Sequence, residues 1–151
     1  MELSDEIRIS APKETVYAAL NDPEILRQAI PGCEELTKLS DTELEAKVVL
    51  KIGPVKAKFS GAVTLDPSNA PDSFGLSGEG KGGAAGFAKG GAEVTLREEG
   101  DETVVSYTAK ASVGGKIAQL GSRLIDGTAK NLSGKFFAKF KEAVEGGGTG
   151  D

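Results

Sequence analysis

The chain has 151 residues, of which 38% are hydrophobic and 27% charged, so we expect one domain that buries its own core. It contains no histidine, which excludes serine–histidine and cysteine–histidine catalytic pairs and histidine-ligated metal sites. Its one cysteine, Cys33, excludes an internal disulfide and a cysteine metal cluster, and a net charge of −5 argues against nucleic acid as a partner.

The beginning of the chain predicts a strand followed by two short helices. Apolar and polar residues alternate over 2–10, which indicates a strand. Pro12 stands in the first turn of a helix that runs through Leu20. Asp22 is a plausible cap for a second helix that begins at Pro23, and the run Ile30-Pro31-Gly32 ends it.

Strand patterns dominate the middle of the chain. Apolar residues at every second position predict six strands, in 36–40, 43–52, 55–65, 74–80, 92–96 and 105–113. Each strand has one apolar and one polar face, which is typical of an antiparallel sheet with one side in water.

Eight glycines fall between Gly75 and Gly91. They neither match the phosphate-binding pattern G-x-x-x-x-G-K-[ST] nor open a helix. Glycines within strands mark bulges, bends and close backbone approach, so we expect a strongly bent sheet. With eight aromatic residues and no tryptophan, either the layers lie close together or an apolar cavity remains, and we favour the cavity.

The last long segment, Gly114–Val144, contains no proline and predicts a helix. Small or apolar residues recur four positions apart, which favours packing diagonally across a sheet: Leu120, Leu124, Thr128, Leu132, Phe136 and Phe140. In a helix Gly121, Gly127 and Gly134 would each cost about 1 kcal/mol relative to alanine. They therefore indicate either close backbone contact or room for a bound molecule.

The same segment is basic, with six basic residues and one acidic residue from Lys116 to Lys141. This is either a solvated face or a surface for anionic lipid or an acidic partner. We expect a cytoplasmic protein, because the start does not resemble a signal peptide and no apolar run is long enough to span a membrane.

The order of elements predicts an α+β fold with helices on one face of an antiparallel sheet. We expect residues 1–144 to form this single domain and residues 145–151 to form a flexible, glycine-rich tail.

Specific runs of residues also resemble a known family. The most specific is Val113-Gly114-Gly115-Lys116-Ile117-Ala118-Gln119-Leu120-Gly121. The others are Ile9-Ser10-Ala11-Pro12, Asn21-Asp22-Pro23-Glu24, Ile30-Pro31-Gly32-Cys33-Glu34 and Gly53-Pro54-Val55-Lys56-Ala57. Over nearly its whole length the chain resembles the carbon monoxide dehydrogenase CoxG family of the START/Bet v 1-like (SRPBCC) superfamily.

The resemblance implies a helix-grip fold, in which a curved antiparallel sheet of about seven strands wraps around a long C-terminal helix and an apolar cavity. It implies binding of a lipid or quinone-like molecule without catalysis, cofactor or metal. Relatives are associated with molybdenum hydroxylases of the carbon monoxide dehydrogenase type, as membrane-recruitment or electron-delivery factors, so subunits of such an enzyme are expected partners. Many relatives carry a membrane-reaching C-terminal extension, whereas this tail has no apolar anchor. A peripheral membrane contact would then fall to the basic helix.

We predict that nine residues line the cavity, with ordinary core packing as the alternative for each: Phe59, Phe74, Leu76, Phe87, Tyr107, Ile117, Leu120, Gly121 and Leu124. The competing hypothesis is a polyketide cyclase or hydratase-like enzyme, whose acid–base group would come from Tyr17, Tyr107, Asp5 or Arg123.

A third hypothesis, compatible with the first, is an adaptor that docks a larger enzyme through the basic helix or the Cys33-Glu34-Glu35 region. Cys33 itself is predicted to be a small, partly buried residue rather than a reactive thiol, because no basic residue adjoins it in the sequence.

Overall fold

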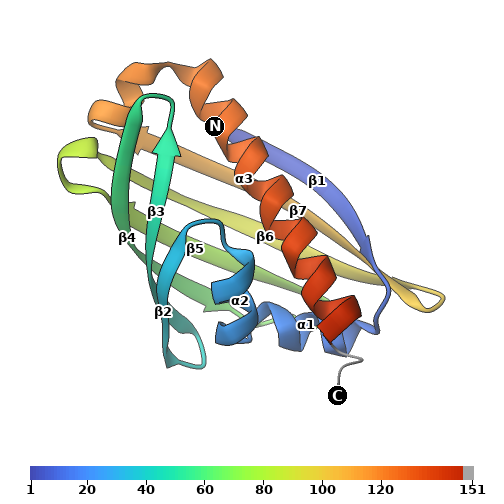
Figure 1. Cartoon of the computed structure of the whole chain (residues 1–151). Helices are drawn as coiled ribbons and strands as arrows, with labels where there is room; N and C mark the ends of the chain where they lie inside the picture. The colour runs from blue at the N-terminus through green and yellow to red at the C-terminus, as the bar shows by residue number, and fades with distance from the viewer. Residues whose placement is uncertain (148–151) are drawn as a thin grey trace.

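A single curved sheet wraps around one long helix in the computed structural model, which describes residues 1–147 (Figure 1). All seven strands pair antiparallel, in the order β1-β7-β6-β5-β4-β3-β2. The strands are β1 (Glu2–Ile9), β2 (Cys33–Ser40), β3 (Glu43–Ile52), β4 (Val55–Asp66), β5 (Ser73–Lys81), β6 (Phe87–Glu99) and β7 (Glu102–Gly114). The predicted α+β helix-grip architecture is confirmed.

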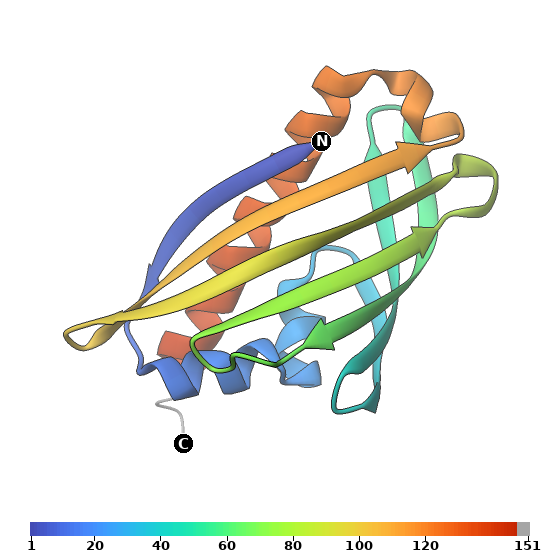
Figure 2. The same ribbon diagram turned by 180° about the vertical axis from the view of Figure 1, so that it is seen from behind.

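Three α-helices cover one face of this sheet. They are α1 (Lys13–Leu20), α2 (Pro23–Ala29) and α3 (Ser122–Glu142). Figure 2 shows α3 behind the curved strands, crossing them diagonally, with α1 and α2 across one end. Asp22 caps α2 as predicted, since its carboxylate accepts a hydrogen bond from the Glu24 N–H.

The glycine-rich stretch lets neighbouring strands approach closely. A Cβ atom at Gly90 on β6 would lie 2.2 Å from the carbonyl oxygen of Lys110 on β7, so only glycine fits there. The stretch does not open an α-helix; β5 leads through a short 3-10 turn at Gly83–Ala85 into β6.

The buried apolar side chains form two separate clusters. The larger one joins α1, the central strands and the end of α3, and Ile9, Val16 and Phe140 are fully buried in it. The smaller one lies at the opposite end of α3, where Phe59 and Ile117 pack with Ile125. The helix is therefore anchored at both ends.

The prediction of one helix over Gly114–Val144 was wrong at its start. Residues Lys116–Leu120 form a separate 3-10 segment, and α3 begins only at Ser122. Gly121 between them has a φ of 95°, a left-handed backbone conformation that glycine adopts without steric cost. The four-residue periodicity carried the prediction across this break because it continues from Leu120 into α3.

The end of α3 is fixed to the start of the domain. The Lys141 ammonium donates to the Arg8 carbonyl at 2.9 Å, and the Ser10 N–H donates to the Glu145 carboxylate at 2.7 Å. A wider helical turn covers Ala143–Gly147, so Glu145 belongs to the ordered domain and not to the predicted tail. The rest of that tail, residues 148–151, lies outside the described residues. Within 1–147, none of the helices combines the length and the apolar character needed to cross a membrane.

Candidate functional site

An apolar cavity of about 360 Å³ lies between the sheet and the second half of α3. Its apolar lining comes from α1, α2, six strands and α3: Leu20, Leu26, Ile30, Leu36, Leu44, Ala46, Val63, Leu65, Phe74, Leu76, Ala92, Val94, Val105, Tyr107, Ala109, Phe136 and Phe137. A space of this size and composition can enclose a small lipophilic molecule.

The sheet supplies its part of the lining through strand alternation. Residues that face each other across neighbouring strands point to the same side, and the register pairs Leu65 with Leu76 and Leu76 with Ala92. The next pair along this row is Ala92 with Ala109. The row thus changes from leucine to alanine, and the small side chains leave the space that larger ones would fill.

Aromatic rings form the wall on the helix side. The rings of Tyr107 and Phe137 stack with centroids 4.9 Å apart, and Phe136 meets Phe137 edge-on at 4.9 Å. On the other side, Tyr17 from α1 packs edge-on against Phe74 at 5.4 Å. These contacts fix the rings that face the space.

The cavity opens beside the turn between β2 and β3. Lys38, Asp41 and Glu45 are the exposed members of its lining, and all three belong to this hairpin. Asn21, in the link between α1 and α2, is a half-buried polar member of the lining. An apolar interior with a polar mouth is the arrangement expected for a binding site that is open to water at one end.

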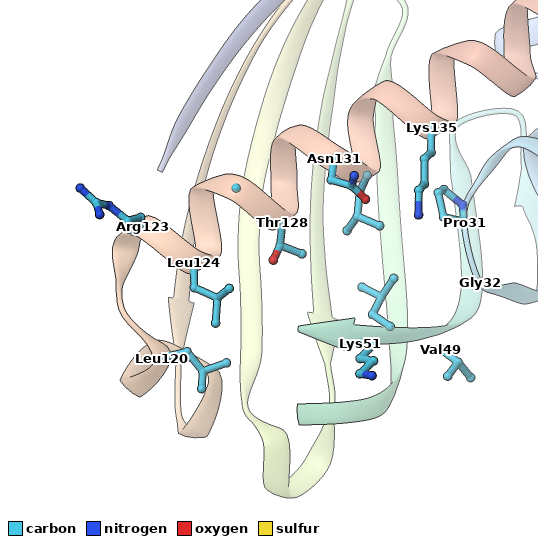
Figure 3. Close-up of a pocket in the computed structure, with 13 residues that line it drawn as sticks. Pro31, Gly32, Val49, Lys51, Leu120, Arg123, Leu124, Thr128, Asn131 and Lys135 are labelled. Carbon is cyan, nitrogen blue, oxygen red and sulfur yellow. The ribbon is translucent and has the colours of Figure 1, made fainter. Parts of the chain in front are cut away.

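A second hollow, an open groove of about 700 Å³, lies against the first half of α3 (Figure 3). Its walls are α3, the end of β3 and the link from α2 to β2. The lining residues are Pro31, Gly32, Val49, Leu50, Lys51, Leu120, Arg123, Leu124, Gly127, Thr128, Asn131, Leu132 and Lys135. It shares no lining residue with the cavity, although the two border on consecutive residues of α3, Leu132 and Ser133.

The structure distributes the nine predicted lining residues over several places. Phe74, Leu76 and Tyr107 line the cavity, and Leu120 and Leu124 line the groove. Phe59 and Ile117 are buried in the smaller core cluster, which is the core-packing alternative for these two positions. Their partners are Ile52, Ala85 and Ile125.

Two of the nine lie in neither lining. Phe87 is 46% exposed at the start of β6, because the strand begins beyond the end of the helix layer. Gly121 is exposed and set by its backbone conformation; a Cβ there would meet nothing within 4 Å, so no close packing requires it.

Sequence reasoning missed the lining residues of the helices and the first hairpin. Leu44 and Ala46 were assigned to one strand face, and that alternation would have found them. Leu26 and Ile30 gave no such signal, because α2 is too short to show a helical period.

The four acid–base candidates do not converge. Tyr107 alone lines the cavity, Tyr17 packs in the core, Asp5 is exposed on β1 and Arg123 lies at the groove. Among residues 1–147 the one buried polar side chain is that of Thr103, whose Oγ1 donates to the Ala11 carbonyl at 2.7 Å. In the same part of the chain, no three His, Cys, Asp or Glu side chains are placed to hold a metal ion.

Cys33 is half-buried at the start of β2, as predicted. Burial raises the pKa of its thiol, although the positive charge of Arg27 and a hydrogen bond to the Glu35 carbonyl act in the opposite direction. Arg27 is the basic neighbour that the local sequence did not reveal, because α2 folds back toward β2 and brings it close.

Comparison with known proteins gives a consistent assignment. The family model of CoxG, the carbon monoxide dehydrogenase G protein, matches residues 6–145. A conserved protein from Geobacillus kaustophilus is 30% identical, with a TM-score of 0.88 and 95% of each chain covered. A search of the curated proteins returned no match.

More distant structures share the fold. A START superfamily protein from Mycobacterium smegmatis has a TM-score of 0.72 at 17% identity, covering 95% of this chain and 97% of that one. The Zhui aromatase/cyclase from Streptomyces sp. R1128 has a TM-score of 0.71 at 11% identity, covering 96% and 93%.

Proposed function

This chain belongs to the carbon monoxide dehydrogenase CoxG family, and on that basis we propose that it is a non-catalytic carrier of a lipophilic small molecule. The observation that carries the proposal is the apolar cavity between α3 and the sheet, with its polar mouth at the β2–β3 hairpin. Its volume of about 360 Å³ falls in the range of roughly 300–1,000 Å³ usual for small-molecule sites.

The lining favours a lipid or quinone-like ligand. Tyr107 and Ser133 supply the hydroxyl groups of its interior, and the rest of the inner wall is hydrocarbon and aromatic ring. A ligand with many polar groups would lose hydration there without gaining hydrogen bonds. A largely apolar molecule with one or two oxygen atoms suits such a wall.

The family also suggests where the ligand is used. We propose that the protein serves a carbon monoxide dehydrogenase-type molybdenum hydroxylase, as an electron-delivery or membrane-recruitment factor in the cytoplasm. The basic α3 is the surface that would approach an acidic face of the enzyme or the membrane. Affinity purification from the native host should then recover molybdenum hydroxylase subunits, and their absence under cross-linking would contradict the partnership.

The carrier proposal is tested by organic extraction and mass spectrometry of the purified protein. Wild type should yield a lipid or quinone, and Ala92→Leu, which fills the alanine end of the cavity, should yield several-fold less. The matched control is Ala62→Leu, an exposed position on β4 outside the cavity lining, which should yield as much as wild type. A wild-type protein that carries and binds no such molecule would overturn the proposal.

A polyketide cyclase or hydratase-like enzyme is the second candidate, and it rests on the Tyr107 hydroxyl at the cavity wall. Such chemistry needs a positioned proton donor. Tyr107→Phe removes the hydroxyl and keeps the ring, so an enzyme would lose turnover of a poly-β-ketone test substrate while a carrier would keep its bound ligand.

A further inference from the structure

The groove beside the first half of α3 exists because β2 stops early. β2 pairs with β3 only as far as Val48, and one further bond runs from the Val49 N–H to the Gly32 carbonyl at 2.9 Å. The last residues of β3 therefore have no strand on their outer side. They face α3 across an open space instead of a packed core.

The groove carries positive charge without a neutralising partner. Lys51, Arg123 and Lys135 line it, and no aspartate or glutamate does. Within residues 1–147, none of these three cations lies within 4 Å of a carboxylate oxygen. An unneutralised cation cluster in a chain of net charge −5 attracts an external anion.

Nearby lysines on the same part of the sheet are paired. The Lys58 ammonium lies 3.0 Å from the Glu34 carboxylate, and that of Lys47 lies 3.7 Å from Glu35. Lack of acidic residues is therefore a property of the groove and not of the whole region.

Apolar side chains lie beside these cations. Leu120, Leu124 and Leu132 come from α3 and the segment before it, and Val49 and Leu50 from β3, and all five are half-buried. They leave hydrocarbon surface in contact with water, which a purely ionic ligand would not cover.

Figure 3 shows the polar groups that converge on the opening. Lys135 extends from α3 toward Pro31, the Thr128 hydroxyl points into the groove, and Lys51 lies on the opposite side on β3. Arg123 extends outward at the far end of the helix. From Leu124 to Lys135 the groove follows α3 for about 16 Å at 1.5 Å per residue.

We propose that this groove binds a single-chain amphiphile with an anionic head, of the chemistry of a fatty-acid carboxylate. The carboxylate lies between Lys51 and Lys135, where two cations and the Thr128 hydroxyl can meet it. The chain runs toward Leu124 and Leu120 and covers their exposed surface. A concave site lined by single side chains suits one molecule, not the flat surface of a bilayer.

The site is separate from the cavity, so its test is arranged to exclude cavity binding. Dodecanoate below its micelle concentration is titrated by calorimetry into Ala92→Leu, whose cavity is filled, and into that variant with Lys51→Gln and Lys135→Gln added. The double charge removal should weaken binding by about fivefold or more. Raising the salt concentration should weaken the binding to the parent variant, because salt screens exposed charges.

The matched control is Lys130→Gln, which removes the same charge from an exposed position of α3 outside the groove lining and should leave the affinity unchanged. Dodecanol and acetate, which carry only the chain or only the head, should each bind more weakly than dodecanoate. Equal losses with Lys130→Gln, or unchanged affinity in the double variant, would overturn the proposal. Binding to phosphatidylglycerol vesicles without binding of monomeric dodecanoate would also overturn it, and would assign the cations to a membrane surface.

Discussion

Thr103 on β7 shows how one side chain fixes the end of the cavity that α1 closes. Its Oγ1 donates to the Ala11 carbonyl, just before α1, and the residue is fully buried. The bond satisfies a carbonyl that water cannot reach, and it positions α1 against the sheet.

Replacing this hydroxyl by a methyl group should therefore destabilise the domain. Thr103→Val keeps the shape but leaves the buried Ala11 carbonyl without a donor, at a cost of about 1–3 kcal/mol in the free energy of unfolding, measured with urea. The control is Thr108→Val on the same strand, whose hydroxyl bonds the Ser4 hydroxyl in an exposed position, and it should cost little. Equal losses at both sites would contradict this role of Thr103.

Cys33 gives a second prediction at the residue scale. Burial raises its thiol pKa, so at a given pH the folded protein holds less of the reactive thiolate than the unfolded chain. The midpoint of the pH profile for iodoacetamide alkylation should lie higher in the folded protein than in urea. Arg27→Gln should move this midpoint further up, because the Arg27 charge lowers the pKa; a downward shift would contradict the assignment.

At the scale of elements, α3 shows what periodicity predicts and what it misses. The stripe Leu124, Thr128, Leu132, Phe136 and Phe140 does face inward, because a helix repeats its faces over this spacing. Periodicity says nothing about where backbone geometry changes, so the break at Gly121 was missed. It also cannot say how far each strand extends past its neighbour, and for that reason Phe87 was placed in the cavity lining.

The two glycines inside α3 have no packing reason. A Cβ at Gly127 or Gly134 would meet nothing within 4 Å, so close contact does not explain either. Gly127 lines the groove, whereas Gly134 lines neither hollow.

Gly134→Ala should therefore stabilise the domain by about 0.5–1 kcal/mol, since alanine loses less backbone freedom in a helix and meets no obstacle here. Urea unfolding measures the change, and ligand content should not alter. Gly127→Ala should stabilise equally but reduce dodecanoate binding, because its methyl group enters the groove. A destabilised Gly134→Ala protein would show that the glycine serves a contact absent from this structure.

At the scale of the whole molecule, the two core clusters lie at opposite ends of α3, and the cavity occupies space beside the larger one. The sheet order and curvature follow from strand alternation and glycine content, which the sequence displays. The cavity follows from which alanines face each other across strands, such as Ala92 and Ala109, and that depends on a register the sequence does not display. A domain that leaves this space unfilled gives up packing energy that a ligand can restore.

Bound ligand should therefore contribute to stability. A ligand present at 100 times its Kd adds about 2.7 kcal/mol, which for a domain of this size corresponds to roughly 5–10 °C in Tm. Delipidation should lower the wild-type Tm by that order, and adding the extracted molecule back should restore it. In Ala92→Leu the leucine occupies the space, so calorimetry should find a Tm that delipidation does not change. If delipidation lowers both Tm values equally, the extracted molecule binds outside the cavity, and the groove beside α3 becomes the site to which its stabilising effect belongs.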